Sequence, residues 1–473
     1  MLISIIIAGL VIEVICTRIV SLGDIMQHIP QFSLMYSTAF IAYLFAVFSI
    51  RRSIVSNTDI HGFAFQTVEI AKGGKPSSKN IFWTILVFSL IFRLTLLPAT
   101  PSNDIFRYLW EGKLQLNWVN PYSSPPASLN MEHLRDNFFS GISHKHLTTI
   151  YPPLMLMVFA LADFISHSFV SIKSAFLLFD ILSIFVLIKY LKVMRKEPAN
   201  VLIYAWSPLV LVSFAARGHC DSLQIFFVML ALYLYSIQNK LTSIVSIGLA
   251  VMSKFASIII VPFLILSNKS KYLTVLVAVV VLLYLPYISA GKGLFLTLFH
   301  FGTQYHYNDS VHFLILCLSL GSPFISKILT SVIFGAVLLY LCKKYLDKEY
   351  FKTRLHRDDN ILRFAFWAVA TLLILAPTVH PWYLTWIVPF LCFYHNWAWL
   401  VLTGTVVFYY FMNLPLFSRL IEYNNEWVRQ EVHWLKLPEY LPFYFLLIYG
   451  FIKDQLLVNK HCSNSKLAVS KQA

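Results

Sequence analysis

The sequence predicts an all-α polytopic membrane protein, and three observations lead to this fold class. Of the 473 residues, 58% are hydrophobic and 12% are charged, whereas soluble globular proteins have about 45–50% apolar and about 25% charged residues. Apolar runs of about 18–20 residues recur, the length that a helix needs to cross a bilayer. The alternating segments of about ten residues that build a membrane barrel do not occur. Because only helices and closed barrels satisfy the backbone in lipid, we expect helices.

The net charge of +15 bears on topology rather than on nucleic-acid binding. The basic residues lie in short loops between apolar runs, which is the pattern of cytoplasmic loops that face anionic lipid. With these loops in the cytoplasm, both chain ends are cytoplasmic. The six cysteines are scattered without a Cys-x-x-Cys pair, so the sequence predicts neither a disulfide framework nor a zinc site.

The apolar segments divide the chain into three parts. Residues 1–81 are expected to form a transmembrane hairpin and a cytoplasmic loop, and the first helix is retained because it lacks a basic start and a cleavage site. Residues 82–457 are expected to form the core, and residues 458–473 a cytoplasmic tail. We predict about 12–14 membrane segments. The candidates are 2–20, 33–50, 82–98, 172–190, 201–216, 222–238, 242–267, 271–288, 323–342, 361–377, 383–396, 397–413 and 441–457.

Two apolar segments are expected to enter the membrane without forming a single continuous span. The 242–267 run is interrupted by "SKFAS" around Lys254, which suggests two half-helices. The 154–169 run follows "YPPL", and a full crossing there would place Arg195 and Lys196 outside, against the charge rule. We therefore expect a re-entrant or interfacial helix at 154–169.

These assignments place four polar segments on the extracytoplasmic side: 99–150, 217–221, 289–310 and 414–440. The first is by far the longest. A loop of about 50 residues between packed helices is uncommon unless it has a function. We therefore expect the catalytic or binding site to lie in residues 99–150 and the shorter segments beside it.

The loop opens with "PSNDIFRYLWEGKLQLNWVNPY". Asp104, Arg107, Tyr108 and Glu111 recur at i, i+3, i+4 and i+7, so they share one face of a helix. That face is either a solvated juxtamembrane surface or the wall of a site. A carboxylate at the water edge can take a proton from an incoming hydroxyl, so Asp104 and Glu111 are the candidate catalytic residues.

The end of the loop, "SHKHLTTIYPPL", contains His144 and His146. Their i, i+2 spacing and the lack of a third ligand nearby disfavour a metal site, and contact with solvent or a phosphate is the preferred interpretation. Tyr122 in "NPY" and Tyr151 in "YPP" lie where proline fixes an extended backbone, and both are candidate substrate-binding residues.

The segment "AARGHCDSLQ" brings Arg217, His219 and Asp221 to the end of two apolar runs. A polar turn with an Arg–Asp pair would explain them. Ionisable groups at membrane depth are costly, however, and are functional candidates by default. Arg217 suits phosphate recognition, and Lys254 would be a second phosphate partner if the helix breaks there; snorkelling is the alternative for Lys254.

The segment "APTVHPWYLTWIVPFL" adds His380 and Tyr383 at a junction broken by proline. An interfacial aromatic belt explains the Trp and Tyr side chains. It does not explain a histidine that lies between two prolines, Pro377 and Pro381. We therefore include His380 and Tyr383 among the candidate substrate-binding residues.

Taken in order, "SNDIFRYLWEGKLQLNWVNPY", "TIYPPL", "ARGHCDSLQ", "SKF" and "HPWYLTWIVPF" resemble bacterial integral-membrane glycosyltransferases of the GT-C fold. There is a looser likeness to the eukaryotic mannosyltransferase of glycosylphosphatidylinositol assembly. The resemblance covers roughly residues 82–413. It implies a GT-C-like helical bundle with a large extracytoplasmic loop in a bacterial inner membrane.

The resemblance also implies a reaction. Such enzymes take a sugar from a polyprenyl- or dolichyl-phosphate donor, here a hexose with mannose as the first expectation, and pass it to a glycan, glycolipid or protein. Their loop acid corresponds to Asp104, and Glu111 fits a "W-[DE]-G" pattern. Many members have Asp-x-Asp or Glu-x-Asp where this chain has Ser102-Asn103-Asp104. The missing first acid leaves the use of a divalent metal open.

A flippase or transporter of lipid-linked sugars is the alternative function, because broken helices and intramembrane cations suit transport as well. Two features disfavour it: we find no inverted repeat, and the polar groups gather on one face rather than at the midplane.

Overall fold

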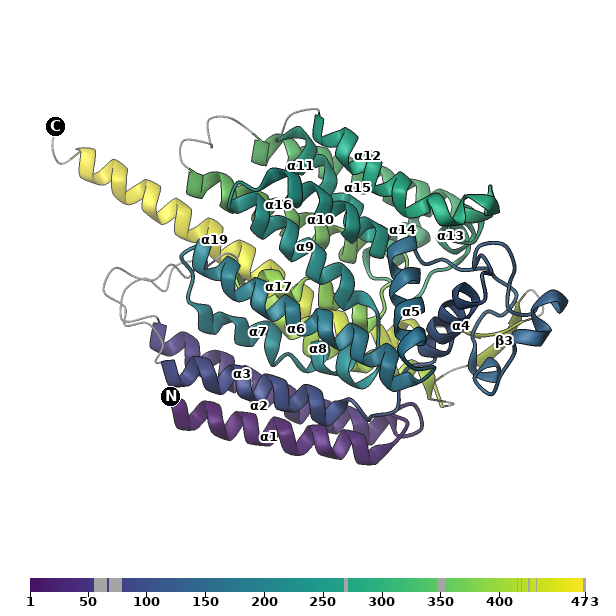
Figure 1. Ribbon diagram of the computed structural model, residues 1–473. Helices are drawn as coiled ribbons and strands as arrows, with labels where there is room; N and C mark the ends of the chain where they lie inside the picture. Colours follow the sequence, from purple (N-terminus) through teal and green to yellow (C-terminus); the bar gives the residue numbers. More distant parts are fainter. Residues whose placement is uncertain are drawn as a thin grey trace.

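The protein is an all-α membrane protein, as the sequence predicts (Figure 1). The computed structural model describes residues 1–54, 66–67, 79–267, 271–346, 354–414, 416–417, 419–423, 426–430 and 432–470. Two short two-stranded ladders complete this part of the chain. β1 (Gln66–Thr67) pairs antiparallel with β2 (Tyr394–His395), and β3 (Arg419–Tyr423) pairs antiparallel with β4 (Glu426–Gln430).

Within the described residues, six helices are long and apolar enough to cross a membrane. A seventh span is possible if one bent pair is counted as a single crossing. The six are α1 (Leu2–Leu22), α2 (Ile29–Ile54), α3 (Lys79–Leu96), α6 (Phe169–Val193), α12 (Lys271–Tyr284) continued by the turn η6 (Leu285–Ala290), and α15 (Pro323–Leu346).

The sequence predicts more segments than this, because several apolar runs fold as shorter or broken helices. The predicted 201–216 segment becomes α7 (Leu202–Ala205), α8 (Pro208–Val210) and the π-helical turn η4 (Leu211–Ala216), with a bend of 50°. The other helices of the bundle are α9 (Asp221–Ser236), α10 (Lys240–Ser253), η5 (Phe255–Ile260), α11 (Val261–Leu266), α16 (Arg354–Leu375), η8 (Pro381–Trp386), α17 (Val388–Leu391), α18 (Trp397–Thr405), η9 (Val406–Asn413) and α19 (Leu437–Ser470).

The two segments predicted not to form a continuous span, 154–169 and 242–267, fold as short helices. Lys254 has an extended backbone between α10 and η5, so the helix breaks at the predicted place. Helix α5 (Pro153–Ile165) has 13 residues, which at 1.5 Å per residue reach roughly 20 Å, less than the roughly 30 Å of a hydrocarbon core. Its length agrees with a segment that does not cross.

Buried polar contacts join the N-terminal helices to the rest of the bundle. The hydroxyl of Tyr43 in α2 donates to the carbonyl of Ile203 at 2.8 Å, and that of Tyr36 donates to the carbonyl of Thr403 at 2.5 Å. The indole of Trp206 donates to the carbonyl of Ile85 in α3 at 2.9 Å. All three bonds are buried: Ile203 and Thr403 lie near helix ends, whereas Ile85 lies in the interior of α3.

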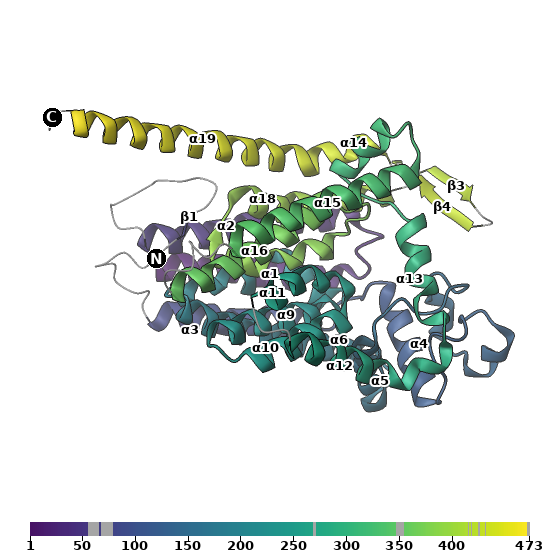
Figure 2. The same ribbon diagram turned by 90° about the horizontal axis from the view of Figure 1, so that it is seen from above.

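Both chain ends lie at one end of the bundle, and the polar segments lie at the other (Figures 1 and 2). The opposite end carries α4 (Asp104–Leu116), the turns η1 (Leu129–Leu134) and η2 (Phe139–Gly141), α13 (Gly293–Gln304), α14 (Val311–Leu318) and the β3–β4 hairpin. The candidate site is built at this end.

Candidate active site

Helix α4 carries the first half of the site. Its apolar face packs on α5, where the ring of Tyr108 stacks on Phe159 with centroids 4.6 Å apart. Just before its first turn, the backbone N–H of Ser102 donates to the carbonyl of Arg217 at 2.9 Å. This bond ties the start of α4 to the turn that precedes α9. Asp104, the first helical residue, therefore lies beside residues that follow it by more than a hundred positions.

The turn at 217–220 depends on a glycine. Gly218 has φ +74°, in the left-handed region that favours glycine, and a Cβ there would lie 2.9 Å from Cγ of Lys173. The turn can therefore lie flat against α6 and α4. It directs His219 toward Asp104, with Nδ1 of the imidazole 3.3 Å from Oδ2 of the carboxylate.

Asp104 opens into a pocket of about 220 Å³. Eight of the twelve residues that the sequence singles out line this pocket, although they come from five separate segments of the chain. They are Asp104, Arg107, Tyr108, Tyr151, Asp221, Lys254, His380 and Tyr383. The prediction that these segments meet on one side of the protein agrees with this arrangement.

The environment of Asp104 favours its ionised form. The side chain is 37% exposed, and burial by itself would raise its pKa. The neighbouring His219 opposes this effect, followed by His380 and Lys254, and the net result is a pKa below the usual value of about 3.9. At neutral pH Asp104 is therefore a carboxylate, with the lone pairs that a proton acceptor needs.

Lys254 supplies a positive charge to the same pocket from the break between α10 and η5. Its ammonium donates to Oδ1 of Asp221 at 2.5 Å, and it lies 4.4 Å from the ring centroid of Tyr383. Asp221 also accepts from the indole of Trp386 at 2.7 Å. An ammonium has three N–H donors, so the bond to Asp221 fixes Lys254 and leaves donors that can face the pocket.

His380 approaches from the segment before η8. A parallel backbone bridge holds this segment: the amide of Tyr307 donates to the carbonyl of Pro377, and the amide of Val379 donates to the carbonyl of Tyr307, both at 2.9 Å. Nδ1 of His380 lies 2.8 Å from the hydroxyl of Tyr409. Burial lowers the pKa of His380 to about 4, so the imidazole is neutral at physiological pH.

Four predicted site residues do not line the pocket. Glu111 is fully buried one turn behind Arg107, whose Nε donates to it at 2.5 Å, and burial raises the pKa of Glu111. Arg217 directs its guanidinium to Asp24, 3.6 Å away in the connection between α1 and α2. His219 lies behind Asp104. The hydroxyl of Tyr122 donates to the carbonyl of Tyr151 at 2.6 Å.

Arg107 connects α4 to the far end of its own loop. Its guanidinium donates to the carbonyls of His144 at 3.3 Å and Leu147 at 2.8 Å. The loop in turn contacts α13, where Thr148 and Thr297 share a hydrogen bond of 2.6 Å. The outer wall of the pocket includes His144, for which the sequence predicts contact with solvent or a phosphate. The rest of this wall consists of residues that the candidate set omits: Ser143, Leu147, Thr148, Thr297, Phe301 and Tyr305. In the sequence, part of this wall could have been found only from the mixed polar and aromatic composition of the loops.

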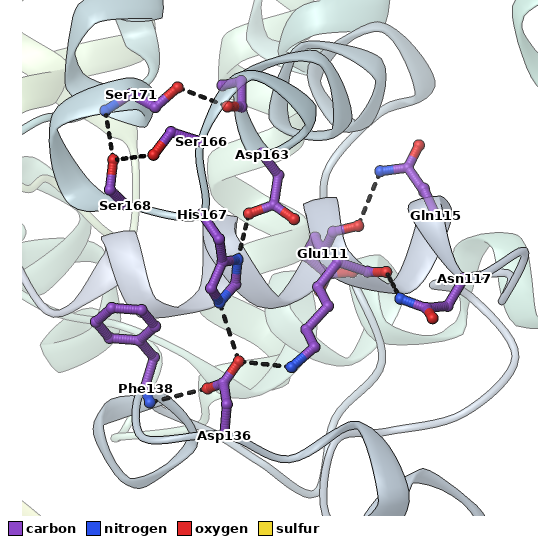
Figure 3. A network of polar contacts seen from close by, with 12 residues as sticks. Glu111, Gln115, Asn117, Asp136, Phe138, Asp163, Ser166, His167, Ser168 and Ser171 are labelled. Atoms are coloured by element: carbon purple, nitrogen blue, oxygen red, sulfur yellow. Dashed lines mark hydrogen bonds and ion pairs between the residues drawn. The ribbon is translucent and has the colours of Figure 1, made fainter.

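A second set of polar contacts anchors the outer loop away from the pocket (Figure 3). His167, after α5, contacts Asp163 through Nδ1 and lies 2.9 Å from Asp136 through Nε2. Asp136 also accepts from Lys113 of α4 at 2.7 Å. The chain Lys113–Asp136–His167–Asp163, which we call the loop clasp, joins the loop to the helices beneath it.

Among the described residues, no group of three or more His, Cys, Asp or Glu side chains is arranged to hold a metal ion. Ser102, at the position where many relatives by resemblance have an acid, is buried and 5% exposed. The carboxylates near the pocket are instead paired with basic partners: Asp104 with His219 and Asp221 with Lys254.

Comparison with protein-family models identifies a family for this chain. No curated protein and no solved structure matches the chain. Residues 13–269, more than half of the 473, match the family described as the alpha-(1->6)-mannopyranosyltransferase N-terminal domain. This match includes α4, the 217–220 turn and Lys254, and it agrees with the resemblance noted in the sequence. The chain therefore belongs to the alpha-(1->6)-mannopyranosyltransferase family and is a membrane glycosyltransferase of the mannosyl-transferring kind.

Proposed function

We propose that this protein moves mannose from a polyprenyl-phosphate donor to an extracytoplasmic glycan or lipid acceptor, with inversion at the anomeric carbon and with Asp104 as general base. The single observation that carries the proposal is the pocket itself. It brings an ionised carboxylate and a fixed ammonium, Asp104 and Lys254, to one cavity from distant parts of the chain.

Lys254 suits the donor end of the reaction. A polyprenyl-phosphate sugar carries one negative charge on its phosphodiester, and a second develops when the bond to the sugar breaks. A cation held in a partly dry site stabilises developing charge better than water does. The ammonium is 23% exposed and is oriented by Asp221. Lys254 therefore has both the charge and the fixed position that a departing phosphate requires.

Asp104 suits the acceptor end. The acceptor hydroxyl gives its proton to the Asp104 carboxylate while its oxygen bonds to the anomeric carbon. The bond from that carbon to the phosphate oxygen breaks, and its electron pair leaves with the polyprenyl phosphate. Because the pKa of Asp104 is lowered, the carboxylate is already ionised when substrate arrives.

A single displacement constrains the configuration of the donor. The family is described by an alpha-(1->6) linkage. If this chain forms that linkage with inversion, its donor must be β-configured at the anomeric carbon. The β-linked mannosyl phosphoryl lipid should therefore be used and the α-linked isomer should not. An α-linked product formed from the α-linked donor would contradict direct displacement.

Membrane placement supports the same assignment. The termini and the end of α2 that carries Arg51 and Arg52 lie at one end of the bundle (Figures 1 and 2). Helices α4 and α13, which contribute residues to the pocket, lie at the other end. With the basic loops in the cytoplasm, the pocket opens on the extracytoplasmic side of a bacterial inner membrane. We also retain the GT-C-like division into an N-terminal part (1–81), a core (82–457) and a tail (458–473) as part of this proposal.

The proposal is tested by transfer from a purified, labelled mannosyl phosphoryl polyprenol in detergent or liposomes. Asp104→Asn keeps the shape of the side chain and removes its basicity, so we expect the transfer rate to fall at least about 100-fold. Glu132→Gln is the matched control, because this carboxylate lies in the same loop and its side chain is 71% exposed. Full transfer by Asp104→Asn would show that another group is the base.

A further inference from the structure

The indole of Trp382 stacks on two imidazoles. The ring centroid of His219 lies 3.8 Å from that of Trp382 with an interplanar angle of 15°, and the ring of His380 lies 4.6 Å away at 10°. In the described part of the chain the two imidazoles make no ring contact with each other, which places them on opposite faces of the indole. The three rings form one stack beside Asp104, which we call the imidazole stack.

The imidazole stack leaves Trp382 no open face for a sugar ring. Its indole lines the pocket, but both faces are already covered. Its role is therefore to hold the imidazoles. His219 itself is only 2% exposed and does not line the pocket, so it cannot touch a substrate directly. Its outward contact is Asp104, 3.3 Å from Nδ1.

We propose that His219 is a positioning residue for Asp104, and that Trp382 fixes the imidazole that performs this role. The proposal rests on the assignment of Asp104 as the base and goes beyond it. Nδ1 lies 3.3 Å from Oδ2 of the carboxylate, and a hydrogen bond that forms there when substrate binds holds that oxygen and leaves Oδ1 to face the acceptor hydroxyl. A rotation of the carboxylate about its side-chain bonds would otherwise turn both oxygens away from the pocket.

His219 takes no part in the bond changes or the proton transfer of the reaction. The acceptor proton goes to Oδ1 of Asp104, the acceptor oxygen bonds to the anomeric carbon, and the phosphate leaves with the electron pair of the broken bond. Asp104 then releases its proton to water. His219 keeps its own Nδ1 proton throughout. Burial lowers the pKa of His219 below its usual value, which favours the neutral imidazole.

The geometry of the contact favours a site that tightens on binding. The Nδ1···Oδ2 distance of 3.3 Å is longer than a usual charge-assisted hydrogen bond of about 2.7–2.9 Å, and Nδ1 has no well-aligned partner in the free protein. Catalytic hydrogen bonds are often long in the absence of substrate and shorten in the complex. Trp382 covers one face of the imidazole and blocks motion toward the indole, and motion in the plane of the imidazole, toward Asp104, stays open.

Two substitutions at position 219 separate positioning from packing. His219→Asn places an amide N–H close to the position of Nδ1, whereas His219→Gln places it near Nε2. If His219 orients Asp104, we expect Gln to lower kcat roughly 10- to 100-fold, the range seen when an orienting partner is lost, and Asn to retain more of the rate. KM for the lipid donor should change little, because His219 does not line the pocket.

The pH dependence of kcat/KM separates the two roles, because it should stay unchanged if His219 only packs against its neighbours. The titratable and charged groups that interact with Asp104 come from every element around it: His219, His380, Lys254, Arg217, Cys220, Tyr108, Tyr151, Tyr383 and Tyr409. Of these, His219 contributes most to the lowered pKa of Asp104. In His219→Gln the acid limb of kcat/KM should therefore move to higher pH, since Asp104 becomes protonated sooner as pH falls. The limb in His219→Asn should move less.

Trp382→Phe and His133→Gln complete the test. Phe keeps a stacking ring and should retain most of the rate, while Trp382→Ala should reproduce the kcat loss and the moved acid limb of His219→Gln. His133 is exposed in the same loop, so His133→Gln should match the wild type. Thermal melting in detergent identifies any variant that fails to fold. If His219→Gln does not fold, His219→Asn is compared directly with the wild type.

The outcomes distinguish this inference from the proposed function. If Asp104→Asn is inactive while His219→Gln has a wild-type rate and an unmoved acid limb, Asp104 remains the base and the positioning role of His219 is wrong. Equal losses in His219→Asn and His219→Gln with an unmoved limb would also overturn it, because that is the result of lost packing. If Asp104→Asn is fully active, the assignment of Asp104 as the base in the proposed function is wrong, and the positioning role of His219 is wrong with it.

Discussion

Arg93 and Asp180 form a salt bridge with no exposed surface. Nε of Arg93 donates to Oδ2 of Asp180 at 2.7 Å and Nη2 donates to Oδ1 at 3.2 Å. Nη1 donates to the Ser89 hydroxyl at 2.8 Å and to the carbonyl of Ala205 at 2.7 Å. Every guanidinium nitrogen and both carboxylate oxygens have a hydrogen-bond partner, so this pair joins α3 to α6 and to the end of α7 without an uncompensated charge.

We expect Arg93→Met to destabilise the protein by about 3–5 kcal/mol, because it leaves Asp180 buried and unpaired. The double variant Arg93→Met, Asp180→Leu should recover much of this loss, since two apolar side chains need no partner. The free energy of unfolding, measured by denaturant titration in micelles for the two singles and the double, checks this. Additive losses in the double variant would contradict the assignment of the cost to an unpaired charge.

Several single residues behave as the sequence suggests and others do not. Asp104 lies in a pocket with the residues predicted to accompany it. Lys254 reaches that pocket, but its partner is Asp221, which the sequence predicts as a substrate-binding residue or as part of a polar turn and not as a partner of Lys254. Arg217 points to Asp24 rather than into the pocket. Sequence spacing cannot reveal these partners, because a long side chain can reach in several directions from one backbone position.

Helices α4 and α5 approach closely at Gly112. A Cβ at this position would lie 2.7 Å from the carbonyl oxygen of Phe159 and 2.8 Å from Cβ of Asp163. Both atoms belong to the α5 backbone or its first side-chain carbon, so neither can move aside on a flexible chain. The absence of a side chain at position 112 therefore sets the distance between the two helices, and with it the position of Asp104.

Gly112→Ala should push α4 away from α5, at a cost of about 1–3 kcal/mol for overpacking, and should lower mannosyl transfer because Asp104 moves with the helix. Gly335→Ala is the matched control: it lies in α15 with nothing within 4 Å of the added Cβ. There alanine should be neutral or slightly stabilising. Thermal melting and transfer rate measure both effects. Wild-type transfer by Gly112→Ala would show that the α4–α5 distance is unimportant.

Hydrophobic runs predict where helices occur more reliably than how long they are. The runs at 2–20, 33–50, 82–98, 172–190 and 323–342 fold as helices long enough to span. The run at 201–216 is bent by 50° where Pro208 starts a new helix. Hydropathy averages over such breaks, since it registers apolar content and not the missing amide hydrogen bond of a proline.

The loop clasp is one of the contacts that hold the outer loop to the bundle, in addition to the hydrogen bonds of Arg107 and of Thr148. Burial would raise the pKa of Asp136, but the bonds from Lys113, from the amide of Phe138 and from His167 lower it overall. A carboxyl whose pKa is lowered on folding contributes stability above its unfolded pKa of about 3.9. That contribution is lost as the pH falls through the lower folded value.

We therefore expect Asp136→Asn to lower the thermal midpoint at pH 7, and its difference from the wild type to shrink steadily as the pH is taken below about 4. At pH 7 the variant loop should also exchange its amide hydrogens faster than the wild-type loop. Melting curves across pH and hydrogen exchange measure the two effects. A difference between variant and wild type that is constant across pH would show that charge at Asp136 is not involved.

The sequence by itself determined the membrane class, the helical content, the break at Lys254 and the segments that meet around Asp104. These follow from composition, apolar run length and loop charge, because whether a segment lies in lipid or in water depends mainly on its own residues. Only the tertiary structure decided which side chains face one cavity: the outer wall from α13, the imidazole stack on Trp382, and the partners of Lys254 and Arg217. Those contacts join residues far apart in the chain, and their geometry depends on how the helices pack.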